Sequence, residues 1–174
     1  MLERITATIF LTILFPFFAL ISVSIYIFSG RPILFKHKRC GYKFDEFYVI
    51  KFRTMHSNHG PELTGYNDKR ITGIGKILRK LKLDELPQLA NIIKGEMVFI
   101  GPRPALYNQD DLADLRIEAG VHTLMPGVTG WAQVNGRDEL SIPVKVQFDE
   151  YYLRNRSWFL DLKIVFLTLL RVLG

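Results

Sequence analysis

The sequence predicts an α+β protein, mostly helical with a small β-sheet, carrying an N-terminal membrane helix and a C-terminal helix that lies in a membrane interface. Three observations predict this architecture. A long uncharged segment stands near the N-terminus, amphipathic helical periodicity recurs in the remainder, and one segment rich in β-branched and aromatic residues alternates as a strand does. We divide the chain into a membrane segment, residues 1–30, and a second domain, residues 31–174.

Composition limits the classes of protein that the chain can belong to. Its 174 residues allow one ordinary domain plus an appendage, and 48% hydrophobic with 23% charged residues exclude wholesale disorder. The single cysteine, Cys40, excludes an internal disulfide framework and a multi-cysteine metal site. The net charge is +6, but the basic residues are scattered singly instead of forming a stripe with aromatics, so we expect no nucleic-acid partner.

The N-terminal segment from Ile5 to Phe28 carries no charged residue. As one helix it would be about 36 Å long, enough to cross a hydrocarbon core. Pro16 lies near its middle and breaks the helical hydrogen-bond ladder, leaving halves of about 17 Å that reach only to the bilayer midplane. Two interpretations stay open: a kinked single span, and a re-entrant helix that returns to its own face. The basic flank that follows places that end on the cytoplasmic side (Arg31, Lys36, Lys38, Arg39, Lys43).

The next segments alternate between strand, loop and helix. Phe47–Met55 is predicted as a strand, and residues 56–69, rich in Gly, Asn and Pro, as a loop. Apolar residues spaced as i, i+3, i+4 and i+7 predict a helix over residues 74–82. A second helix is predicted to begin near Asp84 and to stop at Gly95.

The C-terminal half is predicted from shorter signals. Met97–Ile100 is a short apolar strand that ends in a rigid Gly-Pro-Arg-Pro loop, residues 101–104, and Gln109–Glu118 is a further helix. Trp158–Leu173 is apolar at most positions but too short for a span. It could pack on the core or lie in the membrane interface with Trp158 at headgroup level, and we favour the interface.

Asp84 and Glu85 are the first candidates for chemistry, and their position has two interpretations. Asp is a favoured N-cap and Glu suits the first turn of a helix, so both could be structural. Adjacent carboxylates at a helix start near cations can also hold a divalent metal and present an oxygen nucleophile to phosphorus.

Two further groups of residues suit a phosphorylated substrate. The first comprises isolated cations beside special backbone, among which Arg103 is the strongest because Pro102 and Pro104 fix its backbone. The second is the glycine-punctuated segment Pro126–Arg137, where Gln133 and Asn135 offer amide hydrogen bonds and an ordinary turn is an equal alternative. The other cations of the first group are Lys51, Arg53 and Arg137.

Four motifs together resemble the bacterial sugar transferase family, the monotopic polyprenyl-phosphate phosphoglycosyl transferases. They are KFRTM at residues 51–55, LDELPQLAN at 83–91, KGEMVFIGPRP at 94–104 and PGVTGWAQVNGR at 126–137, in the family's order and spacing. The resemblance implies transfer of a sugar 1-phosphate from a UDP-sugar to a polyprenyl phosphate, usually undecaprenyl phosphate, with release of UMP. It implies initiation of surface-glycan assembly, such as exopolysaccharide or lipopolysaccharide.

The resemblance also assigns roles to residues of this chain. Asp84 would attack the β-phosphorus and form a phosphosugar–aspartyl intermediate, and Glu85 would assist attack by the lipid phosphate. Mg²⁺ held partly by Asp84 would neutralise the diphosphate, while Lys51, Arg79, Arg103 and Arg137 would stabilise phosphate oxygens. Gln133 and Asn135 become candidates for the nucleotide or sugar pocket.

The family's N-terminal helix is re-entrant and is broken at a Ser-Pro pair, which here is Phe15-Pro16. The resemblance therefore implies a protein of the bacterial inner (cytoplasmic) membrane, in contact with membrane lipid, with its catalytic domain on the cytosolic face. Downstream glycosyltransferases are its expected partners. The alternative is a membrane-anchored scaffold of the same fold without activity, against which the intact Asp84, Glu85 and Arg103 argue.

Overall fold

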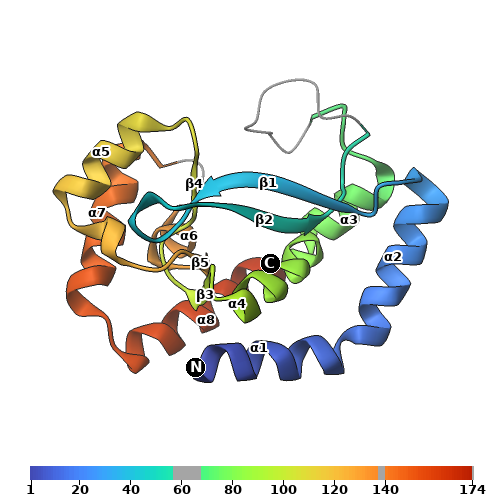
Figure 1. Cartoon of the computed structure of the whole chain (residues 1–174), viewed down its shortest axis with the longest axis horizontal. Coiled ribbons are helices and arrows are strands. Elements are labelled where there is room, and N and C mark those ends of the chain that lie inside the picture. Colours follow the sequence, from blue (N-terminus) through green and yellow to red (C-terminus); the bar gives the residue numbers. More distant parts are fainter. Residues whose placement is uncertain (57–67, 137–139, 174) are drawn as a thin grey trace.

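The computed structural model describes residues 1–56, 68–136 and 140–173, and it confirms a mostly helical α+β fold (Figure 1). Its strands form two small sheets instead of the one predicted. A three-stranded sheet has the order β2-β1-β4, and a separate parallel pair joins β3 to β5.

The uncharged N-terminal segment forms two helices that meet at the predicted break. Helix α1 spans Leu2–Ile13 and α2 spans Phe15–Ser29, with Pro16 in the first turn of α2 and a bend of 62° between the two axes. Proline is tolerated there because the first amides of a helix have no partner within that helix. Within the described residues no single helix is long and apolar enough to cross a bilayer, whereas this bent pair together is.

Both N-terminal helices also pack on the rest of the protein. Ala7 of α1 is fully buried and packs in one cluster with Phe47, Leu89 and Met97, while Ile21 and Ile25 of α2 pack against Leu78 and Phe52. The Glu3 carboxylate accepts a hydrogen bond of 3.1 Å from the amide of Phe99. Figure 1 shows α1 running beneath α4.

The larger sheet is built on β1 (Leu34–Cys40) and β2 (Glu46–Phe52), an antiparallel pair joined through a short 3₁₀ turn, η1 (Tyr42–Phe44). The predicted strand therefore exists but ends three residues earlier, whereas β1 was not predicted. Strand β4 (Ala105–Leu106) pairs with the end of β1. The register places Phe35, His37 and Arg39 on the sheet face that carries Lys51.

The predicted helix over residues 74–82 is α3 (Gly73–Lys80), and Thr72 caps its start by accepting a hydrogen bond from the amide of Gly75. The next segment corrects the sequence prediction. Residues Leu83–Gln88 form a 3₁₀ helix, η2, before the α-helix α4 (Leu89–Lys94) begins. The residue before η2 is Lys82, in the left-handed conformation, so Asp84 lies inside the first turn and is not an N-cap. Gly95 ends α4 in the left-handed conformation, as predicted.

A tightly packed loop follows the predicted short strand, which is β3 (Val98–Ile100). It approaches β5 (Gly127–Thr129) so closely that a Cβ on Gly127 would lie 2.1 Å from the amide nitrogen of Gly101. Only glycine fits such an approach between two backbones. A short helix, α6 (Trp131–Asn135), then occupies the glycine-rich segment where a turn was an alternative.

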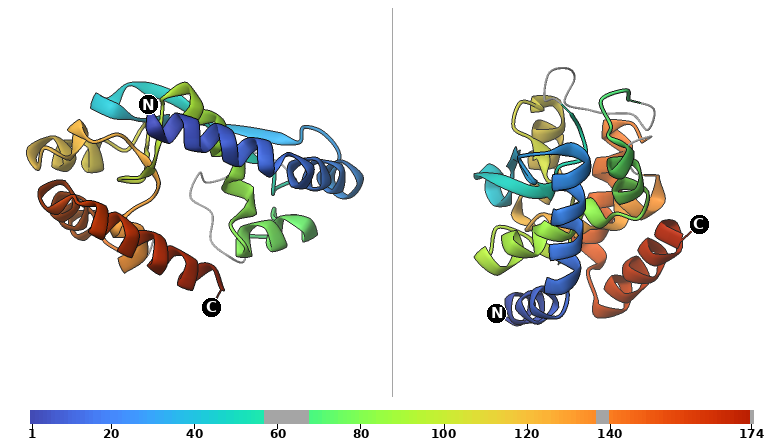
Figure 2. Two further views of the ribbon diagram at one scale, coloured as in Figure 1. Left: turned by 90° about the horizontal axis from the view of Figure 1, so that it is seen from below. Right: turned by 90° about the vertical axis from the view of Figure 1, so that its right-hand side faces the viewer.

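The remaining helices cover one end of the sheet and the underside of the molecule. The predicted helix near residue 110 is α5 (Asp110–Glu118), followed by the 3₁₀ turn η3 (Val121–Thr123) and by α7 (Ile142–Asn155), which was not predicted. The C-terminal helix α8 (Trp158–Leu173) buries Leu160 and Ile164 against Tyr152 and exposes a second apolar face. Figure 2, seen from below, shows α1 and α8 as two rods on this underside.

Candidate active site

The centre of the candidate site is a cluster of charged side chains from three elements. Glu85 comes from η2, Lys51 from β2 and Arg103 from the loop after β3. The Glu85 Oε1 lies 2.7 Å from Lys51 Nζ and 3.6 Å from Arg103 Nη1. The side chain of Glu85 is only 11% exposed, so two of the cations that the sequence nominated meet on one buried carboxylate.

Glu85 is held in its ionised form by these neighbours. Burial by itself would raise the pKa of Glu85, but the nearby Lys51 and Arg103 outweigh it and hold that pKa well below the ordinary range. Burial also lowers the pKa of Lys51, against the attraction of Glu85. A carboxylate in this state orients cations and does not serve as a proton donor near neutral pH.

Asp84, the adjacent residue, has a different environment. It is 8% exposed, and its Oδ1 is buried without a hydrogen-bond partner among the described residues. Burial raises the pKa of Asp84 above its ordinary value, with Glu85 contributing and with Lys51, Lys82 and Arg79 opposing the shift. A buried carboxylate that keeps an unbonded oxygen is costly to the fold and available for chemistry.

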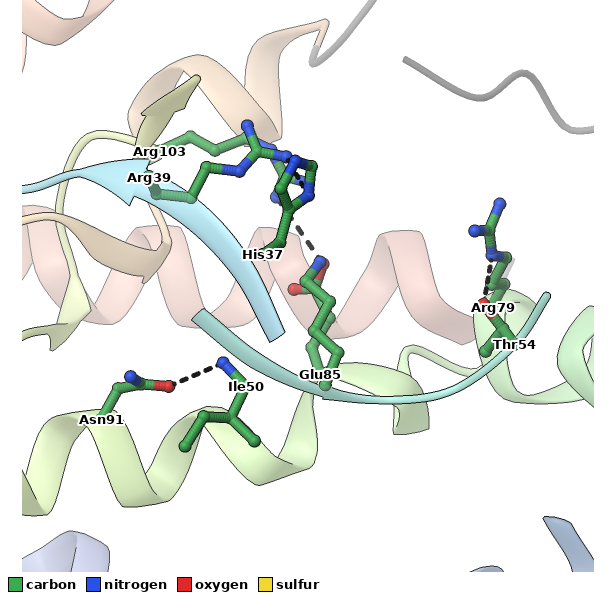
Figure 3. A network of polar contacts seen from close by, with 9 residues as sticks. His37, Arg39, Ile50, Thr54, Arg79, Glu85, Asn91 and Arg103 are labelled. Atoms are coloured by element: carbon green, nitrogen blue, oxygen red, sulfur yellow. Dashed lines mark hydrogen bonds and ion pairs between the residues drawn. The ribbon is translucent and has the colours of Figure 1, made fainter. Parts of the chain in front are cut away.

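Arg79 also lies in the electrostatic surroundings of Asp84. It extends from α3, and its Nε donates a hydrogen bond of 2.9 Å to the Thr54 hydroxyl. Figure 3 places Arg79 and Thr54 on the opposite side of Glu85 from Arg103. The predicted cations thus flank the acidic pair from two directions.

Two residues of this site were missed from the sequence, namely His37 and Arg39 on β1. Figure 3 shows both beside Arg103. An Arg39 guanidinium nitrogen lies 3.2 Å from His37 Nδ1, which must accept because a guanidinium only donates. Burial, followed by the charges of Arg39, Lys51 and Arg103, lowers the pKa of His37 to about 4, so its imidazole is neutral at pH 7. The available signal was spacing, because His37 and Arg39 are two positions apart and therefore share one face of a strand.

Arg53, considered with Lys51 from the sequence, has another task. Its guanidinium donates to the carbonyl oxygens of Ser29, Gly30 and Arg31, at the C-terminal end of α2. A cation there satisfies carbonyls that lack a partner within the helix. Arg53 therefore ties the N-terminal helix pair to the strand that carries Lys51.

The candidate residues of the glycine-rich segment differ in burial and in hydrogen bonding. Gln133 is buried in α6, and neither polar atom of its side chain has a partner among the described residues. Asn135 is exposed and donates a hydrogen bond to the carbonyl oxygen of Trp131 in its own helix. Arg137 lies outside the described residues.

Asp84 can contribute to a magnesium site only as part of a larger ligand set. Within residues 1–56, 68–136 and 140–173, no group of three His, Cys, Asp or Glu side chains is arranged to hold a metal ion. Mg²⁺ is commonly held by one or two carboxylates together with substrate phosphates. The Asp84 carboxylate, which keeps an unbonded Oδ1, fits that pattern as a single carboxylate ligand.

This arrangement can bind and attack a phosphate ester. Lys51, Arg103 and Arg39 supply fixed positive charge for phosphate oxygens, and Asp84 offers a buried carboxylate oxygen as nucleophile. Burial keeps water away from the reacting atoms.

Comparison with known proteins places the chain in a family. The family model described as bacterial sugar transferase matches residues 1–174. The uncharacterized sugar transferase EpsL of Bacillus subtilis (strain 168) is 43% identical, over 83% of this chain and 71% of that protein. The exopolysaccharide production protein ExoY of Rhizobium meliloti (strain 1021) is 37% identical, over 96% of this chain and 81% of that protein.

A third relative is much longer. It is the UDP-glucose:undecaprenyl-phosphate glucose-1-phosphate transferase of Xanthomonas campestris pv. campestris, 39% identical over 99% of this chain but only 38% of that protein. The match over the whole chain, with relatives of which it covers more than two thirds, shows that the chain belongs to the bacterial sugar transferase family.

Proposed function

We propose that this protein transfers a sugar 1-phosphate from a UDP-sugar to a polyprenyl phosphate, undecaprenyl phosphate being the expected acceptor, and releases UMP. One relative is named for this reaction with UDP-glucose. The observation that carries the proposal is the buried, unbonded Oδ1 of Asp84 next to a Glu85–Lys51–Arg103 cluster. The identity of the sugar is left open by these residues.

The first proposed step is attack by Asp84 Oδ1 on the β-phosphorus of the donor. A bond forms between that oxygen and phosphorus, the bond from phosphorus to the bridging oxygen breaks, and UMP leaves with the electron pair. Because its pKa is raised, ionised Asp84 is a more basic nucleophile than an ordinary aspartate. Lys51 and Arg103 offset the negative charge that gathers on the phosphate oxygens.

In the second step an oxygen of the acceptor phosphate attacks the same phosphorus and Asp84 leaves as a carboxylate. No proton has to be removed from an ionised lipid phosphate, which agrees with a site that holds Glu85 ionised. Glu85 assists by keeping Lys51 and Arg103 in place through its Oε1.

Mg²⁺ is the cofactor that we expect, and Asp84 would hold it together with donor phosphates through the carboxylate oxygen that does not attack phosphorus. When bound, the ion would neutralise the diphosphate and the charge on departing UMP. Asp84 would then ligate the ion through one carboxylate oxygen and attack phosphorus through the other, Oδ1.

We also propose that the underside of the molecule contacts the cytosolic face of the bacterial inner membrane. Helix α8 exposes a row of apolar side chains, with Trp158 and Phe159 at its start, and α1 and α2 expose many more. The hydroxyls of Thr8 and Thr12 bond to carbonyls within α1, as polar groups must in lipid. Glycosyltransferases that extend the lipid-linked sugar are the expected downstream partners.

The test is UMP release by the full chain in lipid nanodiscs with undecaprenyl phosphate, Mg²⁺ and a panel of UDP-sugars. We expect release with at least one donor, and a loss of more than about 10³-fold for Asp84→Asn. Asp114→Asn is the matched control, because Asp114 is an exposed carboxylate on α5. Absence of release across the panel, or an unimpaired Asp84→Asn variant, contradicts the proposal.

A further inference from the structure

We infer that Arg116, a residue to which neither the motifs nor the relatives assign a role, is a positioning residue for Arg103. This inference rests on the proposed function, in which Arg103 binds substrate phosphate. Arg116 lies on α5 with a side chain 9% exposed, and its guanidinium donates to Asp149 and to the backbone of Arg103. Its influence on the reaction would pass through the backbone of the loop after β3.

The guanidinium of Arg116 bridges that loop to α7. Its Nη2 lies 2.6 Å from Oδ2 of Asp149, a residue 2% exposed, and its Nη1 donates a hydrogen bond of 2.9 Å to the carbonyl oxygen of Arg103. The planar fork of an arginine reaches two acceptors in fixed directions, which a lysine ammonium does not reproduce. Arg116 thus fixes the position of the Arg103 carbonyl relative to helices α5 and α7.

The neighbouring peptides of this loop are pinned as well. Gly101 donates to the carbonyl oxygen of Thr129 at 2.8 Å, and Gly127 donates to that of Pro102 at 2.9 Å. The peptide of Arg103 comes next, and Arg116 supplies its hydrogen bond. Without that bond the loop keeps the hydrogen bonds of Gly101 and Pro102 but loses the one at Arg103 itself.

The position of this bond matters because of where the Arg103 side chain goes. It extends from the pinned peptide to within 3.6 Å of Glu85, next to Lys51. A small rotation of the peptide is carried along the side chain to the guanidinium. Misplacement of a catalytic group by about 1 Å can cost about 100-fold in rate.

A buried ion pair is a poor choice if stability alone is required, since well-packed apolar residues of similar volume are often as stable or more so. Arg116 Nε is buried without a partner among the described residues, which adds to the cost. Apolar residues at these positions would fill the space, but they could not hold the Arg103 carbonyl. The pair therefore fits a role in geometry better than a role in folding.

The experiment is a double-mutant cycle on the rate of UMP release. Arg116→Met combined with Asp149→Leu removes the pair without leaving an unpaired charge, and it is made in the native chain and in Arg103→Ala. Thermal unfolding verifies that each variant folds. We expect a loss of about 10- to 100-fold in kcat/KM in the native background and less than about 2-fold in the Arg103→Ala background.

The matched control is the exposed pair Arg154–Glu150 on α7, whose nitrogen and oxygen are 2.5 Å apart. Arg154→Met with Glu150→Leu should leave kcat/KM unchanged. Should the buried double variant fail to fold, Arg116→Lys enters the same cycle, because a lysine keeps the charge opposite Asp149 but does not supply the second, directed bond.

The outcomes distinguish this inference from the proposed function. Equal losses in both backgrounds would show a general structural effect and overturn the positioning role, as would the absence of any loss. If the native enzyme releases UMP but the losses are equal in the two backgrounds, only the positioning role of Arg116 is refuted. A native enzyme that releases no UMP with any donor refutes the proposed function instead.

Discussion

Asp84 and Glu85 are neighbours in the chain, yet their surroundings shift their pKa values in opposite directions. Glu85 is paired with Lys51 and Arg103, whereas Asp84 Oδ1 has no partner among the described residues. Pairing makes ionised Glu85 favourable to the fold, and burial without pairing makes ionised Asp84 unfavourable. The two carboxylates should therefore contribute to stability with opposite sign.

Asp84→Asn should raise the free energy of unfolding at pH 7.5 by about 1 kcal/mol, because it removes a buried, unpaired charge. Asp84 has a raised pKa in the folded state, so its destabilising effect is present above that pKa. It disappears as the pH falls through that pKa toward the ordinary value near 3.8. Urea unfolding in detergent at several pH values measures this gain, and a gain that grows as the pH falls would contradict it.

Glu85→Gln should instead lower the free energy of unfolding by about 3 kcal/mol, because it leaves Lys51 and Arg103 beside a neutral side chain. The pKa of Glu85 is lowered in the folded state, so the stabilisation is complete above its ordinary pKa. It is lost only as the pH falls below that value. The same titration compares the two variants, with Asp114→Asn as an exposed control.

The sequence identified the residues of the candidate site better than it identified which of them contact one another. Asp84, Glu85, Lys51 and Arg103 follow from motifs, but the pairing of Lys51 with Glu85 joins residues 34 positions apart and depends on the tertiary fold. Arg39 was missed because LFKHKRC has charges on both faces, one solvent-facing and one lining the site. An alternation rule that expects an apolar face does not detect such a strand.

Among the elements, the edge of β2 depends on one side chain of α4. Asn91 is fully buried, and its Oδ1 accepts a 3.0 Å hydrogen bond from the amide of Ile50. Its Nδ2 donates to the carbonyl oxygen of Tyr48 and to Glu96, both at 2.7 Å. Figure 3 shows Asn91 facing Ile50. The side chain completes the exposed edge of the strand that carries Lys51.

Asn91→Ala should therefore lower the free energy of unfolding by about 3 kcal/mol, since it leaves the part-buried amide of Ile50 and carbonyl of Tyr48 on β2 without their partner. It should also increase hydrogen exchange at the amide of Ile50. Asn155→Ala is the matched control, because Asn155 bonds a single carbonyl on an exposed helix surface. Equal effects of the two substitutions would contradict the role given to Asn91.

Helices with a clear local sequence pattern were predicted, and those whose structure depends on distant residues were not. The helix near residue 74 was found because its apolar positions repeat with the helical period. The α-helix predicted from Asp84 was wrong in its first turn, because Lys82 adopts a left-handed conformation and η2 winds as a 3₁₀ helix. Helix α7 was missed because buried Asp149 interrupts its apolar face, and the partner that makes this burial possible lies on α5.

For the whole molecule, the proposed membrane contact depends on the N-terminal helix pair. Pro16 predicted the break, and the two axes are bent by 62°. The packing of α1 on α4 was not predictable, because the residues that face protein, such as Ala7 and Leu11, have the same apolar character as those that face outward. Arg53 connects the end of α2 to β2.

A re-entrant helix pair predicts that the start of α1 and the body of the protein lie on one side of the membrane. In a Cys40→Ser background, single cysteines at Leu2→Cys and Asp114→Cys should both resist a membrane-impermeant maleimide in intact spheroplasts. Both should react once the membrane is made permeable. Labelling of Leu2→Cys in intact spheroplasts would show a spanning helix and contradict the re-entrant arrangement.

The most direct measurement is the intact mass of the enzyme after incubation with Mg²⁺ and an active UDP-sugar, but with no lipid acceptor. We expect the added mass of one phosphosugar group, located by peptide mapping on Asp84 and discharged when undecaprenyl phosphate is supplied. Asp84→Asn should show no added mass. UMP release in full turnover by a protein that never carries this adduct would contradict the account.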